Sequence, residues 1–421
     1  MSKLIYFDNS STTIISPQAK NTYIKWLECY NSSTDSKIVK TAKEQIDSAK
    51  HYILNHCGVS AYTHTILFTS GGTESNCFII RSCVEAFKRK LLKKNIILLP
   101  HIIVSAIEHH SITDCINDLV QTSQITATFI KPSIYGFINP ADIQKEIKKE
   151  TCLVIVMFAN NEIPVINNLK EIGKVAHKFN IPVHSDAVQI FGKIKFDMAK
   201  NNIDSLSASA HKFYGPKGSG ICIISNDFLK GYDMRAIING TQQYNLRGGT
   251  ENIPGILSLK TALENAFINR NKKNEHLFTL TNYLKEKLSE IFKIATVLNY
   301  PSFLNTISII FLGPVDITET LPGTVLLSVC KQQGKPFCNV ELKKYLDKNN
   351  IVVSIGSACN TNSEKSSHVL TALNLPPVIK KGVLRISFND HNTKQEINKF
   401  INVFISGVKL QCADMVKDKK G

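Results

Sequence analysis

The chain has 421 residues, of which 43% are hydrophobic and 20% charged, a composition typical of a globular protein of about two domains rather than a disordered one. No apolar run reaches the roughly 18 residues of a membrane-spanning helix, so we do not expect a membrane protein. No long apolar core precedes Asp8, so we expect neither a signal nor a transit peptide, and we expect a cytoplasmic location. The net charge of +16 comes from basic residues spread along the chain without interleaved aromatic residues, which favours a solvated surface over nucleic-acid binding.

Short apolar runs alternate with amphipathic stretches over the first 255 residues. The apolar runs predict seven strands, at Ile66–Thr69, Ile102–Ser105, Ala127–Ile130, Leu153–Phe158, Pro182–Ser185, Ser205–Ser209 and Gly220–Ile224. The stretches between them predict helices at Glu74–Lys94, Ile112–Gln121, Pro140–Lys149 and Leu169–Phe179. Apolar strands that alternate with helices indicate an α/β fold with a mostly parallel sheet covered on both faces.

The pattern changes after about Gly255. A long helical segment, Ile256–Phe292, is followed by a predicted strand at Thr306–Leu312, a looser region at Gly313–Cys338, a helix at Val340–Asn349, and strands at Ile351–Ser354 and Val383–Phe388. These elements predict a second, smaller α/β domain. We expect a large domain over 14–260 and a small domain formed by 1–13 together with 261–421.

The sequence Thr69-Ser70-Gly71-Gly72-Thr73-Glu74 follows a predicted strand and opens a predicted helix. Free amides at the start of a helix bind phosphate well, and the Thr73 hydroxyl can add a further donor. The segment matches neither a Walker loop nor a dinucleotide-binding fingerprint. Seen alone, it is also compatible with an ordinary capped turn.

A lysine and an aspartate follow two other strands of the predicted sheet. Lys212 lies in a tight, glycine-rich turn between Ser209 and Gly220, where desolvation or nearby positive charge would lower its pKa and suit it to Schiff-base chemistry. Asp186 ends a buried strand, where a carboxylate needs a partner such as a pyridinium nitrogen, although a helix-capping role is also compatible with the pattern.

Further polar residues follow other strands. His109 and Asn160 come after strands whose carboxyl ends lie at the edge where open α/β sheets bind ligands. Cys359 lies among small polar residues, where its thiol would be accessible and could act as a nucleophile, although most of the 11 cysteines are expected to be small buried groups. No Cys-x-x-Cys pair is present, and no metal is expected. Arg385, inside an apolar strand, needs an anion, either a substrate carboxylate or an internal acid.

Taken together, these segments resemble a known family. The chain is similar to the cysteine desulfurases of NifS/IscS type within the class V aminotransferases, from Tyr6 to about Asn392. The resemblance rests on the ordered motifs Thr-Ser-Gly-Gly-Thr-Glu-Ser-Asn, Glu-His-His, Asn-Asn-Glu, Asp-Ala-Val-Gln, Ser-Ala-His-Lys, Arg-Gly-Gly-Thr and Gly-Ser-Ala-Cys. It implies the aspartate aminotransferase-like fold type I, pyridoxal 5'-phosphate as cofactor, and removal of sulfur from L-cysteine to give L-alanine and an enzyme persulfide.

The resemblance also implies a role for each site residue. The implied catalytic residues are Lys212, which forms the Schiff base, Cys359, which takes up sulfur, and His109, which stacks on the cofactor ring. The implied cofactor-binding residues are Gly72, Thr73, His109, Asn160, Asp186, Gln189, Ser209, His211, Lys212 and Thr250. Of these, Thr250 would contact the phosphate of a partner subunit, which implies a homodimer. The implied substrate-binding residues are Asn31, Asn160 and Arg385, and a sulfur-acceptor protein of an iron–sulfur cluster or thiolation pathway is the expected partner.

The sequence departs from the family pattern outside the cofactor motifs. It has Tyr30-Asn31-Ser32-Ser33 near the first helix, an eroded glycine-rich stretch at 239–245, and Gly313–Cys338 as an apparent insertion in the small domain. Two alternatives therefore stay open. One is a selenocysteine or cysteine lyase of the same family, and the other is a cofactor-binding scaffold of low activity with nucleic-acid affinity.

Overall fold

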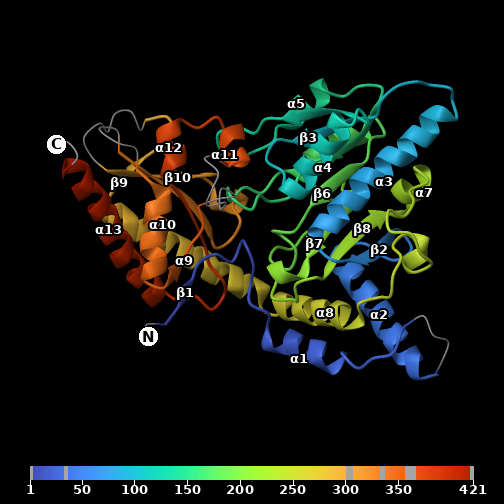
Figure 1. Ribbon diagram of the computed structural model, residues 1–421, viewed down its shortest axis with the longest axis horizontal. Helices are drawn as coiled ribbons and strands as arrows, with labels where there is room; N and C mark the ends of the chain where they lie inside the picture. The colour runs from blue at the N-terminus through green and yellow to red at the C-terminus, as the bar shows by residue number, and fades with distance from the viewer. Residues whose placement is uncertain (1–2, 33–36, 300–306, 332–336, 356–366, 418–421) are drawn as a thin grey trace.

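The computed structural model describes residues 3–32, 37–299, 307–331, 337–355 and 367–417 and arranges them around two main sheets (Figure 1). In this view the larger sheet lies on the right and the smaller sheet on the left, with both chain termini on the left. Within the described ranges, no helix is both long and apolar enough to cross a membrane.

The larger sheet contains all seven strands that the sequence predicts. They are β2 (His64–Thr69), β3 (His101–Ser105), β4 (Thr126–Ile130), β5 (Thr151–Ile155), β6 (Val183–Asp186), β7 (Ser205–Ser209) and β8 (Gly220–Ser225). Their order is β2-β8-β7-β6-β5-β3-β4, in which β8 is antiparallel to both neighbours and the other pairs are parallel. The mostly parallel seven-stranded sheet is therefore confirmed.

Helices cover both faces of this sheet. They are α1 (Pro17–Lys25), α2 (Lys37–His56), α3 (Gly72–Leu92), α4 (His110–Gln121), α5 (Pro140–Lys145), α6 (Leu169–His177), α7 (Asn226–Gly231) and α8 (Ile253–Phe267). In β2, Leu67 joins one apolar cluster with residues of α3, α4 and α7, whereas Ile66 and Phe68 join the other with residues of α2, α6 and α8. Because successive strand residues point to opposite faces, burial of both faces requires the unbroken apolar runs seen in the sequence.

The long helix predicted over Ile256–Phe292 is in fact two helices. α8 ends at Phe267, and α9 (Arg270–Ile291) begins after Asn269, which has a φ of 54°. That left-handed conformation stops the i to i−4 hydrogen-bond ladder and redirects the chain, and asparagine adopts it more readily than most residues. α8 packs against α1 and α2, while α9 contributes buried leucines to the core of the smaller sheet.

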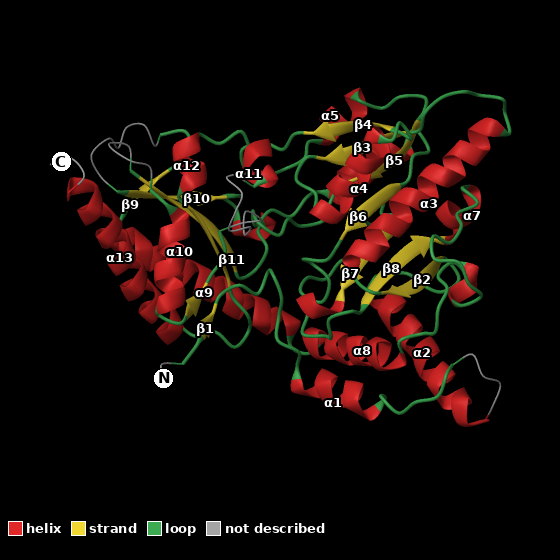
Figure 2. Ribbon diagram, in the orientation of Figure 1, coloured by secondary structure: helices red, strands yellow, loops and turns green. Residues whose placement is uncertain are grey.

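The smaller sheet has the order β13-β11-β10-β9. Figure 2 labels β9, β10 and β11 of this sheet on the left of the view. Its strands are β9 (Lys293–Ala295), β10 (Ser308–Leu312), β11 (Thr324–Cys330) and β13 (Val383–Ser387), and a separate pair joins β1 (Ile5–Tyr6) to β12 (Ile351–Val352). The accompanying helices are α10 (Asn339–Lys348), α11 (His368–Ala372), α12 (Pro377–Lys381) and α13 (Lys394–Lys417). The prediction of a looser region at Gly313–Cys338 was wrong in part. This segment contains β11, a fully buried strand between β13 and β10.

The opening segment packs with the second half of the chain. Ile5 and Phe7 belong to the apolar cluster formed by α9, β11, β13 and α13. Residue Asp8 then bridges to Ser387 at the end of β13 before the chain crosses to the larger sheet. The domain boundaries at 13/14 and 260/261 remain predictions.

Candidate active site

A cavity of about 450 Å³ opens where the larger sheet meets β13. Its lining comes from the carboxyl ends of strands, from the starts of α3 and α4, and from the N-terminal segment. The residues are Ser10, Ser11, Gly72, Thr73, Asn76, His109, Ser111, Met157, Asn161, Asp186, Val188, Gln189, Ser209, His211, Lys212, Ser354 and Arg385. Nine residues that the sequence points to, spread from Gly72 to Arg385, thus surround one space.

The start of α3 forms one wall of the cavity. No side chain caps the helix at Gly71, so the amides of its first turn are left for a ligand. Glu74 does not compete for that position, because its carboxylate accepts from Arg247 Nε at 2.9 Å and from the Ser70 amide at 2.7 Å. A Cβ at Gly220 would lie 2.5 Å from the Cα of Gly71, so only glycine lets β8 approach this turn. The wall is therefore suited to a phosphate group.

Asp186 is buried at the end of β6 and is held by two donors. Its Oδ2 accepts from Asn76 Nδ2 at 2.9 Å, and its Oδ1 accepts from the Val188 amide, also at 2.9 Å. Asn76 in turn accepts from His184 Nε2 at 3.0 Å, and burial lowers the pKa of His184 to about 3. A neutral His184 and a fixed Asn76 therefore orient the Asp186 carboxylate toward the cavity.

Lys212 lies at the end of a short 3₁₀ turn that follows β7. Its Nζ donates to the carbonyl oxygens of Ser10 at 2.6 Å and Ser11 at 2.7 Å. Burial, followed by the positive charges of Lys193 and Arg385, lowers the pKa of Lys212 to about 7. A lysine with that pKa is largely unprotonated just above neutral pH, which is the form that attacks a carbonyl carbon.

Two histidines flank the lysine. His109 caps α4, and its Nδ1 accepts from the Ser111 amide at 3.1 Å, so the proton of the neutral ring is on Nε2. The ring is open to the cavity, yet desolvation by the surrounding protein lowers its pKa. His211 Nδ1 lies 3.0 Å from Thr12 Oγ1, and burial followed by the Lys212 charge lowers the pKa of His211 to about 4. Both rings are therefore neutral at pH 7 and present a flat face and a hydrogen-bonding group.

Gln189 offers an acceptor without a protein partner. Its Nε2 donates to the Ser10 carbonyl at 3.0 Å, whereas its buried Oε1 has no hydrogen-bond partner within the described part of the chain. A buried amide oxygen is costly unless a ligand or water completes its hydrogen bonds. The orphaned oxygen lines the same cavity as Asp186 and Lys212.

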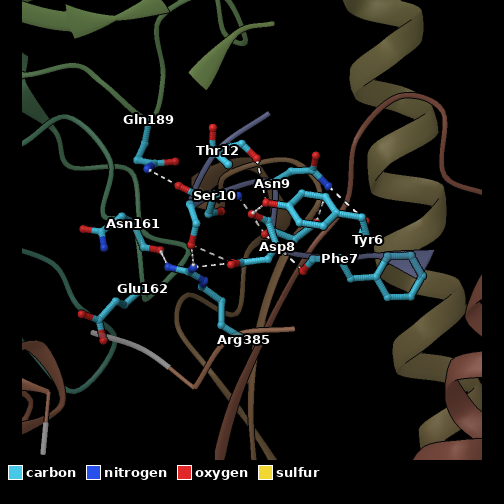
Figure 3. A network of polar contacts seen from close by, with 12 residues as sticks. Tyr6, Phe7, Asp8, Asn9, Ser10, Thr12, Asn161, Glu162, Gln189 and Arg385 are labelled. Atoms are coloured by element: carbon cyan, nitrogen blue, oxygen red, sulfur yellow. Dashed lines mark hydrogen bonds and ion pairs between the residues drawn. The ribbon is translucent and has the colours of Figure 1, made fainter. Parts of the chain in front are cut away.

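Arg385 reaches the cavity from β13 and lies at the centre of the polar network in Figure 3. Its Nη1 donates to the Asn161 carbonyl at 2.5 Å, and its Nη2 donates to Asp8 Oδ1 at 2.6 Å and Ser11 Oγ at 2.7 Å. Its side chain is only 4% exposed. A buried guanidinium at a cavity wall is suited to a carboxylate ligand.

Several predicted site residues lie elsewhere. Asn160 is completely buried outside the cavity, where its Nδ2 donates to the Ile107 carbonyl and its Oδ1 accepts from the amides of 162 and 163; its neighbour Asn161 lines the cavity instead. Asn31 and Thr250 are exposed and are not part of the cavity lining. Cys359 lies outside the described residues, in the segment 356–366 that follows the cavity residue Ser354 and Ile355.

Sequence reasoning assigned no role to several cavity residues. They are Ser10, Ser11, Asn76, Ser111, Met157, Asn161, Val188 and Ser354. Asn76 carried the clearest signal, since a buried asparagine one turn into an apolar helix needs polar partners. The run of small polar residues after Asp8 was a second signal, because it lies between β1 and α1, outside any helix or strand that would satisfy its backbone.

Comparisons with known proteins agree with this geometry. The class-V aminotransferase family matches residues 5–400. A cysteine desulfurase IscS of Clostridium botulinum is 35% identical over 413 residues, covering 96% of this chain and 94% of its own length. A cysteine desulfurase IscS of Dictyoglomus turgidum is 32% identical over 406 residues, covering 96% and 94% of the two chains.

The fold is also similar to that of solved structures. A NifS-like protein superposes with a TM-score of 0.81 at 27% identity, covering 97% of this chain and all of its own chain. A NifS-like protein of Rickettsia africae superposes with a TM-score of 0.79 at 26% identity, again over 97% of this chain. Sequence, cavity and fold therefore lead to one conclusion: the chain belongs to the class-V aminotransferase family, alongside the cysteine desulfurases.

Proposed function

We propose that the protein is a pyridoxal phosphate-dependent cysteine desulfurase, which converts L-cysteine to L-alanine and keeps the sulfur as an enzyme persulfide for an acceptor. The observation that carries the proposal is one cavity that joins Lys212, with a pKa of about 7, to Asp186, the open start of α3 and Arg385. The amine would meet the cofactor carbonyl, the carboxylate the ring nitrogen and the anion site the phosphate. The guanidinium would meet the carboxylate of the bound amino acid.

The residues present fit this cofactor. The amides at the start of α3, with Thr73 and Ser209, would hold its phosphate, and Asp186 would pair with its ring nitrogen. The orphaned Oε1 of Gln189 would face a polar ring substituent, and His109 would lie against the ring face. The cofactor supplies a carbonyl that condenses with amines and a ring that stores negative charge.

The other residues provide binding and proton transfer. Arg385 would bind the substrate carboxylate, with Asn161 beside it. With a pKa of about 7, Lys212 is partly unprotonated at neutral pH, so its amine can accept a proton from the α-carbon of the substrate and return it to carbon later. We retain Asn31 as a candidate for the rim of the substrate pocket.

The sulfur step depends on Cys359. Its thiolate would bond to the substrate sulfur while the carbon–sulfur bond breaks, the electron pair stays with carbon, and carbon takes up a proton. One L-cysteine and one enzyme thiol thus give one L-alanine and one enzyme persulfide. In the sequence, Cys359 comes five residues after the cavity residue Ser354.

A homodimer and a sulfur-acceptor protein complete the proposal. Thr250 is exposed, as are the apolar side chains of Ile237 (43%) and Ile238 (45%), which border a small apolar pocket with Arg247. Exposed apolar groups of this kind are typical of subunit contacts. We expect a second copy to cover this face and to place its Thr250 near the phosphate site. The acceptor protein would receive the persulfide sulfur for iron–sulfur clusters or thiolation.

A direct experiment is to record the absorbance spectrum of the purified protein before and after it receives L-cysteine, and to measure alanine and sulfide. We expect a visible cofactor band that changes on addition, with equal amounts of alanine and sulfur. Faster release of selenide from selenocysteine would instead favour a selenocysteine lyase. Salt-sensitive nucleic-acid binding without cysteine turnover would favour a scaffold.

A further inference from the structure

The contacts of Arg385 raise a question about how a substrate carboxylate reaches it. A guanidinium offers two edges with two parallel donors each, one formed by Nε and Nη2 and the other by Nη1 and Nη2. Both edges include Nη2. In the structure that nitrogen already donates to Asp8 Oδ1 at 2.6 Å and Ser11 Oγ at 2.7 Å. Neither edge is therefore free for bidentate binding of a ligand.

Asp8 and Ser11 hold this arrangement together. The Ser11 hydroxyl donates to Asp8 Oδ1 at 2.9 Å, so the two acceptors and Nη2 form a closed triangle. The backbone of Asp8 is also held by a parallel β-bridge to Ser387, which lies two residues after Arg385 on β13. Side-chain exposure is 17% for Asp8 and 4% for Arg385, so the pair is largely shielded from water.

The donors that remain on Arg385 are informative as well. Its Nε is buried and has no partner among the described residues, and Nη1 donates to the Asn161 carbonyl at 2.5 Å. The unpartnered Nε can serve a ligand carboxylate only once it is uncovered, and the second, parallel hydrogen bond forms only when Nη2 leaves Asp8 or Ser11. Among the described residues, Asp8 is the carboxylate that forms an ion pair with Arg385.

We propose that Asp8 is an internal carboxylate that competes with the substrate for Arg385 and thereby sets the affinity and selectivity of the site for ligands with a carboxylate. This inference rests on the proposed function in one respect, the assignment of Arg385 as the carboxylate anchor. An amine without a carboxylate gains nothing from displacing Asp8. A ligand with a carboxylate replaces the ion pair between Asp8 and Arg385 by an equivalent pair of its own with Arg385. Its net affinity is therefore lowered by the free energy of the Asp8–Arg385 pair that it breaks.

The alternative role for Asp8 is that of a positioning residue that holds Arg385 ready for the substrate. The two roles predict opposite results. If Asp8 competes, its removal leaves a buried guanidinium without an anion, and a ligand carboxylate is then bound more tightly. If Asp8 only orients Arg385, its removal loosens the anchor and binding becomes weaker.

The test uses the holoenzyme and L-alanine, the expected product, as the carboxylate ligand. In isothermal titration calorimetry we expect Asp8→Asn to bind L-alanine about tenfold more tightly than the wild type, which corresponds to about 1.4 kcal/mol of lost competition. The matched control is Asp118→Asn. Asp118 Oδ2 forms an exposed ion pair with Arg81 Nη2 at 2.7 Å, and loss of this carboxylate should leave the dissociation constant of L-alanine unchanged. Ethylamine, which has no carboxylate, should show no gain.

A second measurement avoids the cofactor altogether. In cofactor-free protein, phenylglyoxal modifies arginines that are free of carboxylate partners, and peptide mass spectrometry follows the modification of Arg385. We expect faster modification in Asp8→Asn than in the wild type. Ser11→Ala removes the second acceptor of Nη2 together with the hydrogen bond from Ser11 to Asp8, while the Asp8 carboxylate stays in place. We expect a smaller change in the same direction, of about threefold in L-alanine affinity. Circular dichroism checks that both variants fold.

The outcomes separate this inference from the proposed function. Equal or weaker L-alanine binding in Asp8→Asn, or no binding in either protein, would overturn the inference. The inference would also be overturned if Arg385→Ala bound L-alanine as tightly as the wild type, because Arg385 would then not be the carboxylate anchor. A wild type that makes no alanine from L-cysteine would contradict the proposed function, while tighter L-alanine binding in Asp8→Asn would still support competition by Asp8.

Discussion

The pKa of Lys212 leads to a quantitative prediction about cofactor capture. An isolated lysine with the ordinary pKa of 10.5 is neutral in roughly one molecule in 3,000 at pH 7, whereas a pKa of about 7 leaves about half of the Lys212 amines neutral. Since only the neutral amine condenses with an aldehyde, we expect the rate of pyridoxal phosphate capture by cofactor-free protein to rise through pH 7 and to level off above about pH 8.

The assay is stopped-flow mixing of cofactor-free protein with pyridoxal phosphate between about pH 5.5 and 9.5, followed by visible absorbance. The same titration with a free lysine derivative corrects for ionisation of the cofactor itself. A rate that keeps rising with pH beyond about pH 9 would refute the reasoning, because it would show that Lys212 keeps an ordinary pKa.

A charge variant tests the cause of the shift. After burial, the largest cause of the lowered pKa of Lys212 is the positive charge of Lys193, which is itself desolvated and has a pKa of about 8. Replacing Lys193 by methionine should therefore move the midpoint of capture to higher pH. Lys217→Met is the matched control, since Lys217 is exposed and acts on His211 rather than on Lys212. An equal shift in both variants would contradict this explanation.

Three further predictions concern the cofactor, the nucleophile and the phosphate turn. Lys212→Ala should abolish the visible absorbance of the bound cofactor, and an unchanged spectrum would remove the Schiff-base assignment. Cys359→Ala should keep that absorbance but form no persulfide, as measured by sulfane-sulfur labelling; full activity would reassign the nucleophile. Gly220→Ala should lower the free energy of unfolding, measured by urea denaturation, by about 1–3 kcal/mol, because its Cβ would lie 2.5 Å from the Gly71 Cα. Gly231→Ala should not lower it, because nothing lies within 4 Å of a Cβ at that position.

The sequence alone predicted the larger sheet and much of the site. Most strands of that sheet contain short apolar runs, because the inner strands are buried on both faces, and such runs are visible without a structure. The residues that follow strands of one sheet share an edge, so the sequence pattern places Asp186, His109 and Lys212 together, and all three line one cavity. In the smaller domain the pattern was less clear, and the turn-forming residues around β11 concealed a buried strand.

The tertiary structure decided which side chains face the cavity and what they contact. Asn160 and Asn161 are neighbours of the same type, yet one lies buried outside the cavity and the other lines it, because the turn after β5 uses the first to satisfy its own backbone. Lys212 meets the carbonyl of Ser10 across 202 residues, and Arg385 meets Asp8 across 377. Local patterns carry no information about such pairings, because they arise only when two separately folded sheets and the N-terminal segment pack together.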